Sequence, residues 1–93
     1  MSAETALEDA IRARLQALAP RELHVVDDSA RHAGHAEARG GGHFRLRIVS
    51  ARFTGLARVA RHRLVYDLLS DLIPLRIHAL ALELRSPDEN PDR

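Results

Sequence analysis

"HFRLRIVSARFTGLARVARHRLVYDLL", residues 43–69, is the stretch that decides the fold. Its first part alternates between apolar residues and arginines, which predicts a half-buried β-strand. The apolar positions of this strand are Phe44, Leu46 and Ile48. Gly55 then marks a turn, and a shorter turn or helix is expected around residues 56–60. After it, Val65, Leu68, Leu69 and Leu72 have the i, i+3, i+4, i+7 spacing of an amphipathic helix, which we expect to continue up to Pro74.

The next segment, "IHALALEL" at residues 77–84, predicts another strand. Alternation places His78 on one face with Leu80, Leu82 and Leu84. Ile77, Ala79 and Ala81 should then lie on the opposite face. A helix between two strands is the usual connection of a parallel pair, so we expect these two strands to be parallel.

Two further elements precede the opening stretch. "TALEDAIRARLQALAP", residues 5–20, begins with a capping box of Thr5 and Glu8 and continues with apolar residues at helical spacing, until Pro20 ends the helix. "ELHVVDDS", residues 22–29, is a short β-branched strand, antiparallel to the one that follows it. The sequence therefore predicts an α+β fold: a three-stranded mixed sheet with helices packed on one face. Residues 1–93 should form a single domain, flexible at 1–4 and 87–93.

Length and composition limit the function. A chain of 93 residues can bury one modest core, which leaves little room for an enclosed active site and favours a binding module. The chain has no cysteine, so neither disulfides nor thiolate metal sites are available to it. It has no apolar run near the roughly 20 residues of a membrane span, and nothing resembling an export signal. We therefore expect a cytoplasmic protein that does not enter membranes.

The basic residues are distributed unevenly. All 14 are arginine, and residues 39–66 hold seven of them without any acidic residue. The seven are Arg39, Arg45, Arg47, Arg52, Arg58, Arg61 and Arg63. Such a segment could attract nucleic acid or an acidic protein surface, or could form the solvated faces of a strand and a helix. Both interpretations stay open at this point.

The segment between the first two strands, "DDSARHAGHAEARGGGHF" at residues 27–44, holds three of the six histidines. A loop of this length is typically functional or mobile, and the run Gly40, Gly41 and Gly42 allows it to close over a bound metal. His32 and His35 are the candidate ligands, against the alternative that they are solvated loop residues. His43 is expected to have a structural role at the strand start, and His62 a surface or capping role.

Taken together, three segments closely resemble the BolA family: "DDSARHAGH", the opening stretch, and "IHALALEL". The resemblance extends from Leu7 to Pro87. Its most specific parts are the HF-to-IVS strand, the F-x-G turn, the "RHR-x-VY" helix and the "IHAL" strand. It implies a class II KH-like fold in the order αββααβ.

The resemblance also implies a partner and a cofactor. BolA-like proteins pair with monothiol glutaredoxins around a bridging [2Fe–2S] cluster, for which the glutaredoxin cysteine and glutathione supply sulfur. The nitrogen ligands carried over by position are His78 and, from the loop, His32, with His35 as its rival. We thus expect an adaptor in iron–sulfur cluster trafficking or iron and redox regulation, monomeric and without cofactor when alone, and heterodimeric with glutaredoxin.

The alternative implied by the family is a DNA-binding transcriptional regulator of stress response and cell morphology. Arg58, Arg61, His62 and Arg63 are then the candidate contacts to nucleic acid, or to a protein partner. The chain lacks the GxxG loop of KH domains and has few aromatic residues for base stacking. A zinc enzyme is disfavoured, because "HAGH" lacks a glutamate base, so we expect no enzymatic activity.

Overall fold

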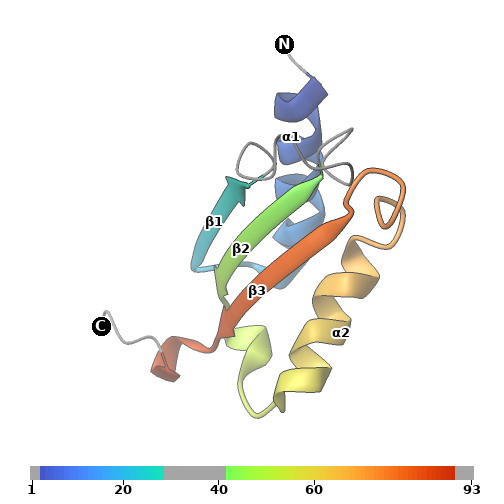
Figure 1. Cartoon of the computed structure of the whole chain (residues 1–93). Coiled ribbons are helices and arrows are strands. Elements are labelled where there is room, and N and C mark those ends of the chain that lie inside the picture. Colours follow the sequence, from blue (N-terminus) through green and yellow to red (C-terminus); the bar gives the residue numbers. More distant parts are fainter. Residues whose placement is uncertain (1–2, 29–41, 90–93) are drawn as a thin grey trace.

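The computed structural model describes residues 3–28 and 42–89 and has two α-helices and a three-stranded sheet (Figure 1). In chain order the elements are α1 (Ala3–Leu15), a 3₁₀ turn (Gln16–Leu18), β1 (Glu22–Asp27), β2 (His43–Val49), a 3₁₀ turn (Ala51–Phe53), α2 (Arg58–Leu68), β3 (Ala79–Arg85) and a last 3₁₀ turn (Pro87–Glu89). This order confirms the predicted α+β class.

The sheet is mixed, as expected. The strand order is β1-β2-β3, with β1 antiparallel to β2 and β3 parallel to β2. The register places Leu46 of the central strand between Val25 of β1 and Leu82 of β3. These three side chains therefore face the same side of the sheet.

Both helices lie on that side and close one hydrophobic core (Figure 1). The buried residues come from α1, α2, the turns and the inward face of the sheet; they are Leu7, Ile11, Leu15, Leu18, Val25, Phe44, Leu46, Ile48, Phe53, Val65, Leu69, Leu72 and Ile77. Each large apolar side chain contributes about 1.5–3 kcal/mol by leaving water. The predicted alternation of the central strand is confirmed, since Leu46 and Ile48 are fully buried whereas Arg45, which precedes Leu46, is exposed.

The segment between β2 and β3 differs from the prediction in two respects. Its first helical piece is the turn Ala51–Phe53, not 56–60, because the Ser50 hydroxyl accepts a hydrogen bond from the Arg52 N–H and caps it there. The α2 helix ends at Leu68, and residues 69–76 form turns. Leu69 and Leu72 are nevertheless buried, so the apolar spacing predicted burial correctly while the backbone had already left the helix.

The prediction that His78 shares a face with Leu80 is wrong. Ile77 is 1% exposed and belongs to the core, whereas His78 is exposed. The reason is that β3 begins only at Ala79, and the N–H groups of His78 and Ala79 both donate to one acceptor, the carbonyl oxygen of Gly42. Two successive donors on one carbonyl interrupt the alternation, as in a β-bulge.

At the chain ends, the start of α1 differs from the expectation. The helix α1 begins at Ala3, so Thr5 lies inside it and is not its N-cap. Residues 87–89 form a 3₁₀ turn, and the Glu89 carboxylate pairs with Arg61; the flexibility expected for residues 87–93 stays a prediction. Residues 1–2 and 90–93 lie outside the described part of the chain. Within the described part, none of the helices has the length and apolar character needed to cross a membrane.

Candidate functional site

His78 is the last residue before β3, and its position is fixed through the backbone. Its N–H donates to the carbonyl oxygen of Gly42 at 2.7 Å, and the Ala79 N–H donates to the same oxygen at 3.1 Å. The backbone is thus anchored to the start of β2, while the side chain remains exposed. An imidazole in this position is accessible to a ligand or a partner protein.

Gly42 makes this arrangement possible. Its φ of +85° lies in the left-handed region that favours glycine, and a Cβ atom there would overlap the Arg76 carbonyl oxygen and lie 3.1 Å from the His78 nitrogen. The chain before β3 therefore approaches β2 more closely than any other residue type at position 42 allows. Nothing in the glycine run of residues 40–42 marks Gly42 in the sequence, because its contact partners, Arg76 and His78, are distant along the chain.

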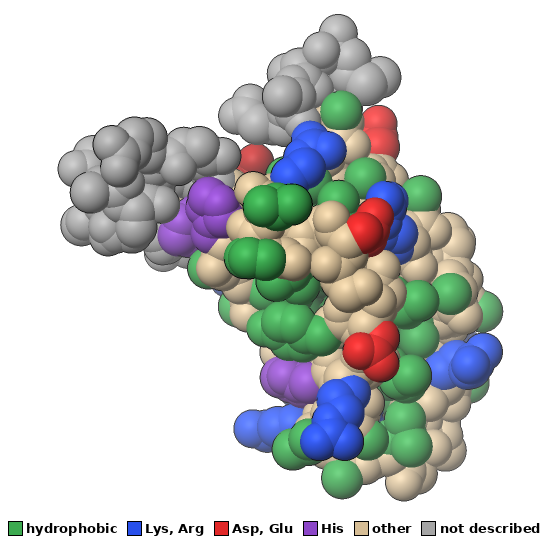
Figure 2. Space-filling model, turned by 90° about the vertical axis from the view of Figure 1, so that its right-hand side faces the viewer, with side chains coloured by type: hydrophobic (Ala, Val, Ile, Leu, Met, Phe, Trp, Pro, Cys, Tyr) green, Lys and Arg blue, Asp and Glu red, His purple; other side chains and the backbone are tan. Residues whose placement is uncertain are grey.

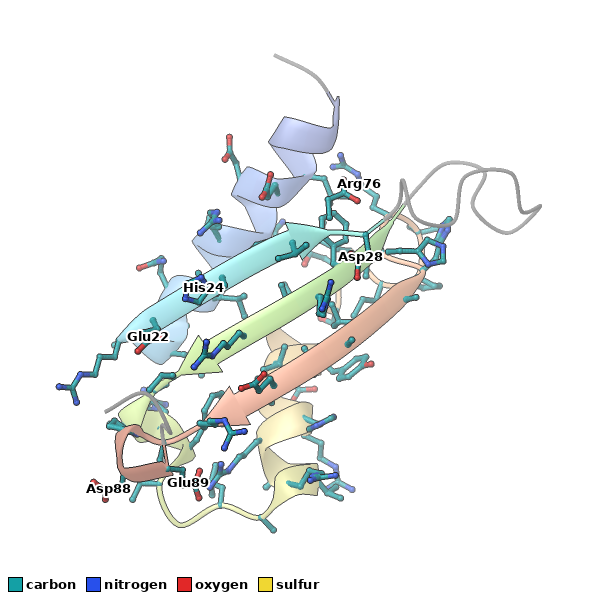
Figure 3. All side chains as sticks on the ribbon, turned by 60° about the vertical axis from the view of Figure 1, so that its left-hand side comes forward. Glu22, His24, Asp28, Arg76, Asp88 and Glu89 are labelled. Atoms are coloured by element: carbon teal, nitrogen blue, oxygen red, sulfur yellow. The ribbon has the colours of Figure 1, made fainter. Side chains whose placement is uncertain are left out.

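The segment that carries the two loop histidines is attached at the same end of the sheet. Before it, the Asp28 N–H donates to the His43 carbonyl oxygen at 2.7 Å, and the Asp28 carboxylate accepts from Arg45 at 3.1 Å. After it comes Gly42, whose carbonyl oxygen accepts a hydrogen bond from the His78 N–H. Figure 3 shows Asp28 and Arg76 at this end.

The predicted ligands His32 and His35 lie outside the described residues. Among residues 3–28 and 42–89, no group of three His, Asp or Glu side chains could hold a metal ion. His43 begins β2, in register with Ala79, and its side chain is half-buried. Figure 2 shows histidine side chains in two separate places on one face of the molecule.

The predicted arginine-rich contacts lie at the other end of β3. A cleft of about 670 Å³ opens between α2 and β3. Arg58, Arg61 and His62 contribute to it, and the remaining lining residues are Leu56, Leu82, Glu83, Leu84, Arg85 and Glu89. Arg63 is exposed on α2 but is not part of this lining. Seven residues of strand extend over about 20 Å, so the cleft and His78 are separate sites.

Arg61 is engaged inside the molecule. Its guanidinium donates to both carboxylate oxygens of Glu89, at 2.6 and 3.0 Å, and also to the carbonyl oxygens of Leu56 and Leu84. Its carbon Cζ lies 5.9 Å from the centre of the Phe53 ring, and its side chain is only 11% exposed. The hydrogen bonds from Arg61 and from the Ser86 N–H lower the pKa of Glu89 to about 2.

Three of the seven arginines in the acid-free stretch form ion pairs in three dimensions. Arg45 pairs with Asp28, Arg47 pairs with Glu83, and Arg61 pairs with Glu89. Each partner comes from outside residues 39–66, which is why the sequence run suggested a stronger positive field than the fold presents. Glu89 was missed by sequence analysis because nothing local in the tail indicates a partner in α2.

Comparison with known proteins gives consistent matches. Residues 15–89 match the profile of the family described as BolA-like protein. SufE-like protein 1, chloroplastic/mitochondrial, of Arabidopsis thaliana is 48% identical over 86 residues, which are 85% of this chain and 23% of that protein. BolA-like protein 1 of Mus musculus is 43% identical, with 91% of this chain and 64% of that protein covered. The chain thus spans less than two thirds of either relative.

A solved structure extends the similarity to the fold. The BolA domain of SufE1 from Arabidopsis thaliana superimposes with a TM-score of 0.79 at 42% identity. The match covers 97% of this chain and 99% of that domain. The α+β fold with its mixed sheet is therefore shared with a solved domain over nearly the whole chain.

Proposed function

Because the chain belongs to the BolA-like protein family, we propose that it is an adaptor that binds a monothiol glutaredoxin and co-ligates a bridging [2Fe–2S] cluster. The histidine ligands are His78 and one of the loop pair, His32 or His35. The biological role is iron–sulfur cluster trafficking or iron and redox regulation.

The observation that carries this proposal is the exposed imidazole of His78 beside the attachment of the histidine-bearing segment. Gly42 is the residue that ends this segment and also the residue that anchors His78. His35 stands seven positions before Gly42, and an extended chain of seven residues reaches about 25 Å. A loop histidine can therefore reach His78 without any change in the sheet.

The donor set fits the proposed cluster. Neutral imidazole is a competent iron ligand, and the chain, which has no cysteine, needs the glutaredoxin and glutathione to supply sulfur. A histidine-ligated cluster supplies one-electron redox chemistry with a raised potential. The proposed role of this chain is to present two imidazole nitrogens to the cluster from outside the core.

Anaerobic reconstitution with a monothiol glutaredoxin and glutathione tests the proposal. Visible absorption and circular dichroism should report a heterodimer spectrum distinct from that of the glutaredoxin homodimer. His78→Ala should abolish or alter it, and His32→Ala and His35→Ala should identify the loop ligand. His24→Ala is the matched control, because His24 is exposed on β1 beside Glu22 (Figure 3). An unchanged glutaredoxin spectrum with the wild-type chain contradicts the proposal.

DNA binding by a stress-response or morphology regulator stays a prediction. Arg58, His62 and Arg63 remain candidate contacts, but Arg61 is paired with Glu89, and Glu83 also borders the cleft. Affinity that falls steeply with salt would support DNA as a ligand, and no binding at physiological salt would contradict it.

The remaining parts of the proposal concern assembly and place in the cell. We propose that the free protein is a monomer and that it forms a heterodimer with glutaredoxin. We also propose that it is cytoplasmic and has no enzymatic activity of its own. Sedimentation of the free and mixed proteins tests the assembly. Two matched plant relatives carry the word chloroplastic in their names, so fractionation is the direct test of the compartment.

A further inference from the structure

The N-terminal end of α2, where the helix dipole is positive, borders the cleft between α2 and β3. The α2 helix begins after Ala57, a residue without a side-chain capping group, and its first turn contains Arg58 and Arg61 and no acidic residue. Acidic residues are the usual partners of a helix N-terminus, since the helix dipole is positive there. Two guanidinium groups at this end instead add to the positive potential.

Glu89 supplies the missing negative charge from the other end of the chain. Its two carboxylate oxygens occupy the fork of Arg61, and one of them also accepts the Ser86 N–H at 3.0 Å. This bidentate geometry is the one in which arginine recognises carboxylates most strongly. The cleft therefore already contains a carboxylate ligand, which is contributed by the protein itself.

The turn that carries Glu89 is held mainly by polar contacts. Pro87, Asp88 and Glu89 are half-buried or exposed, and the Glu89 side chain is 46% exposed. Figure 3 shows Asp88 and Glu89 at the end of β3, away from the body of the sheet. Little apolar contact is lost when such a turn detaches from the rest of the protein. Another carboxylate can therefore compete with Glu89 for Arg61.

The rest of the cleft suits an extended peptide. Leu82 to Arg85, which border it, belong to β3, an edge strand of the three-stranded sheet. The outer backbone groups of an edge strand can pair with an added strand, apart from the Leu84 carbonyl here, which accepts from Arg61. Arg58 and His62 add polar contacts, and Leu56 and Leu82 add apolar ones.

We propose that this cleft is a docking site for an extended acidic peptide segment of a partner protein, in which a carboxylate of the partner replaces Glu89 on Arg61. The turn of residues 87–89 is then an internal competitor that lowers the affinity for weakly acidic sequences. The proposal goes beyond the cluster ligands, since the cleft and His78 lie at opposite ends of β3.

A peptide fits these residues better than a nucleic acid does. Among the described residues that line the cleft, none is Phe, Tyr or Trp, the side chains on which bases usually stack. Arg61 already holds Glu89 as a bidentate carboxylate, and the carboxylate of a partner peptide can take the same place while its backbone pairs with the edge of β3.

Nuclear magnetic resonance titration of the labelled chain with a blocked peptide of alternating glutamate and valine tests the proposal. Shifts should concentrate at the Arg61 Nε–H and the amides of residues 82–86, 88 and 89. Glu89→Gln should bind about tenfold more tightly, if the internal carboxylate occupies Arg61 in about nine molecules of ten. Arg58→Gln should weaken binding, and Arg63→Gln, a change on the same helix outside the lining, should not.

Three outcomes overturn the proposal: shifts outside the cleft, equal affinity of Glu89→Gln and wild type, or tighter binding of a single-stranded decanucleotide than of the peptide at physiological salt. The last outcome would assign the cleft to nucleic acid. Arg58→Gln keeps the test meaningful if Glu89→Gln disturbs the turn, because Arg58 is exposed. Cluster assembly with glutaredoxin should be unchanged in Glu89→Gln, so the two proposals can fail separately.

Discussion

The carbonyl oxygen of Gly42 accepts hydrogen bonds from the N–H groups of both His78 and Ala79, at 2.7 and 3.1 Å. One backbone atom thus sets the position of the exposed imidazole and the point at which β3 begins. The geometry depends on the absence of a side chain at position 42, because the Arg76 carbonyl occupies that space.

Gly42→Ala should destabilise the protein by about 2–4 kcal/mol, through the positive φ and the overlap with the Arg76 carbonyl. Gly55→Ala is the matched control. Gly55 also has a positive φ, +79°, but an added methyl group would meet no atom within 4 Å, so we expect about 1–2 kcal/mol. Urea unfolding measures both. If both variants lose the same free energy of unfolding, the close approach of the Arg76 carbonyl to Gly42 does not contribute to the cost of Gly42→Ala.

Ser50→Ala should cost about 1–3 kcal/mol, because the buried hydroxyl donates to the Leu18 carbonyl at 2.6 Å and accepts from the Arg52 N–H at 3.0 Å. Removing it leaves the buried Leu18 carbonyl without this donor. Ser70→Ala, at an exposed position after α2, should change stability by less than about 0.5 kcal/mol. Thermal unfolding of the two variants gives the comparison, and similar melting temperatures would contradict it.

Leu72 lies beyond the end of α2 yet is only 4% exposed. Leu72→Ala should therefore destabilise the fold by about 2–5 kcal/mol, the range for a large side chain removed from a core. Leu75→Ala should have little effect, since Leu75 is 82% exposed. Chemical denaturation distinguishes the two, and a small loss for Leu72→Ala would mean that the turn after α2 packs loosely.

The Arg61–Glu89 pair should make stability depend on pH in the acid range. The pKa of Glu89 is lowered in the folded protein from 4.5 to about 2, so the unfolded chain takes up this proton first as the pH falls. The stabilisation is complete above about pH 5 and is lost progressively towards pH 2. Denaturation curves of wild type and Glu89→Gln should converge in that window. Asp88→Asn, at the exposed neighbour, should leave the difference unchanged, and parallel curves would contradict the pairing.

The elements with strict local patterns could be predicted from the sequence. The alternation through Phe44 and Ile48 located β2, and a helical connection to the next strand predicted the parallel pair. Family membership followed from motifs in the same stretch and is confirmed by the match over residues 15–89. These features depend on residues close together in the chain.

The features that were missed depend on contacts between distant segments. Apolar spacing reports burial, so it could not show that α2 ends at Leu68 while Leu72 stays buried. The inward position of Ile77 follows from hydrogen bonds to Gly42, and the Glu89 carboxylate pairs with Arg61. Of the candidate ligands, His78 is among the described residues and His32 and His35 are not, and the ligand role of all three stays a prediction.

Because the alternation is interrupted before β3, the side chain at position 78 and the packing of the core do not depend on each other, as they would in a regular strand. Residue 78 contributes no side chain to the core, and the neighbouring Ile77 fills that space. A change from imidazole to thiol or carboxylate at position 78 therefore requires no repacking. The chemical identity of a donor at this position can vary, in evolution or by design, independently of the stability of the fold.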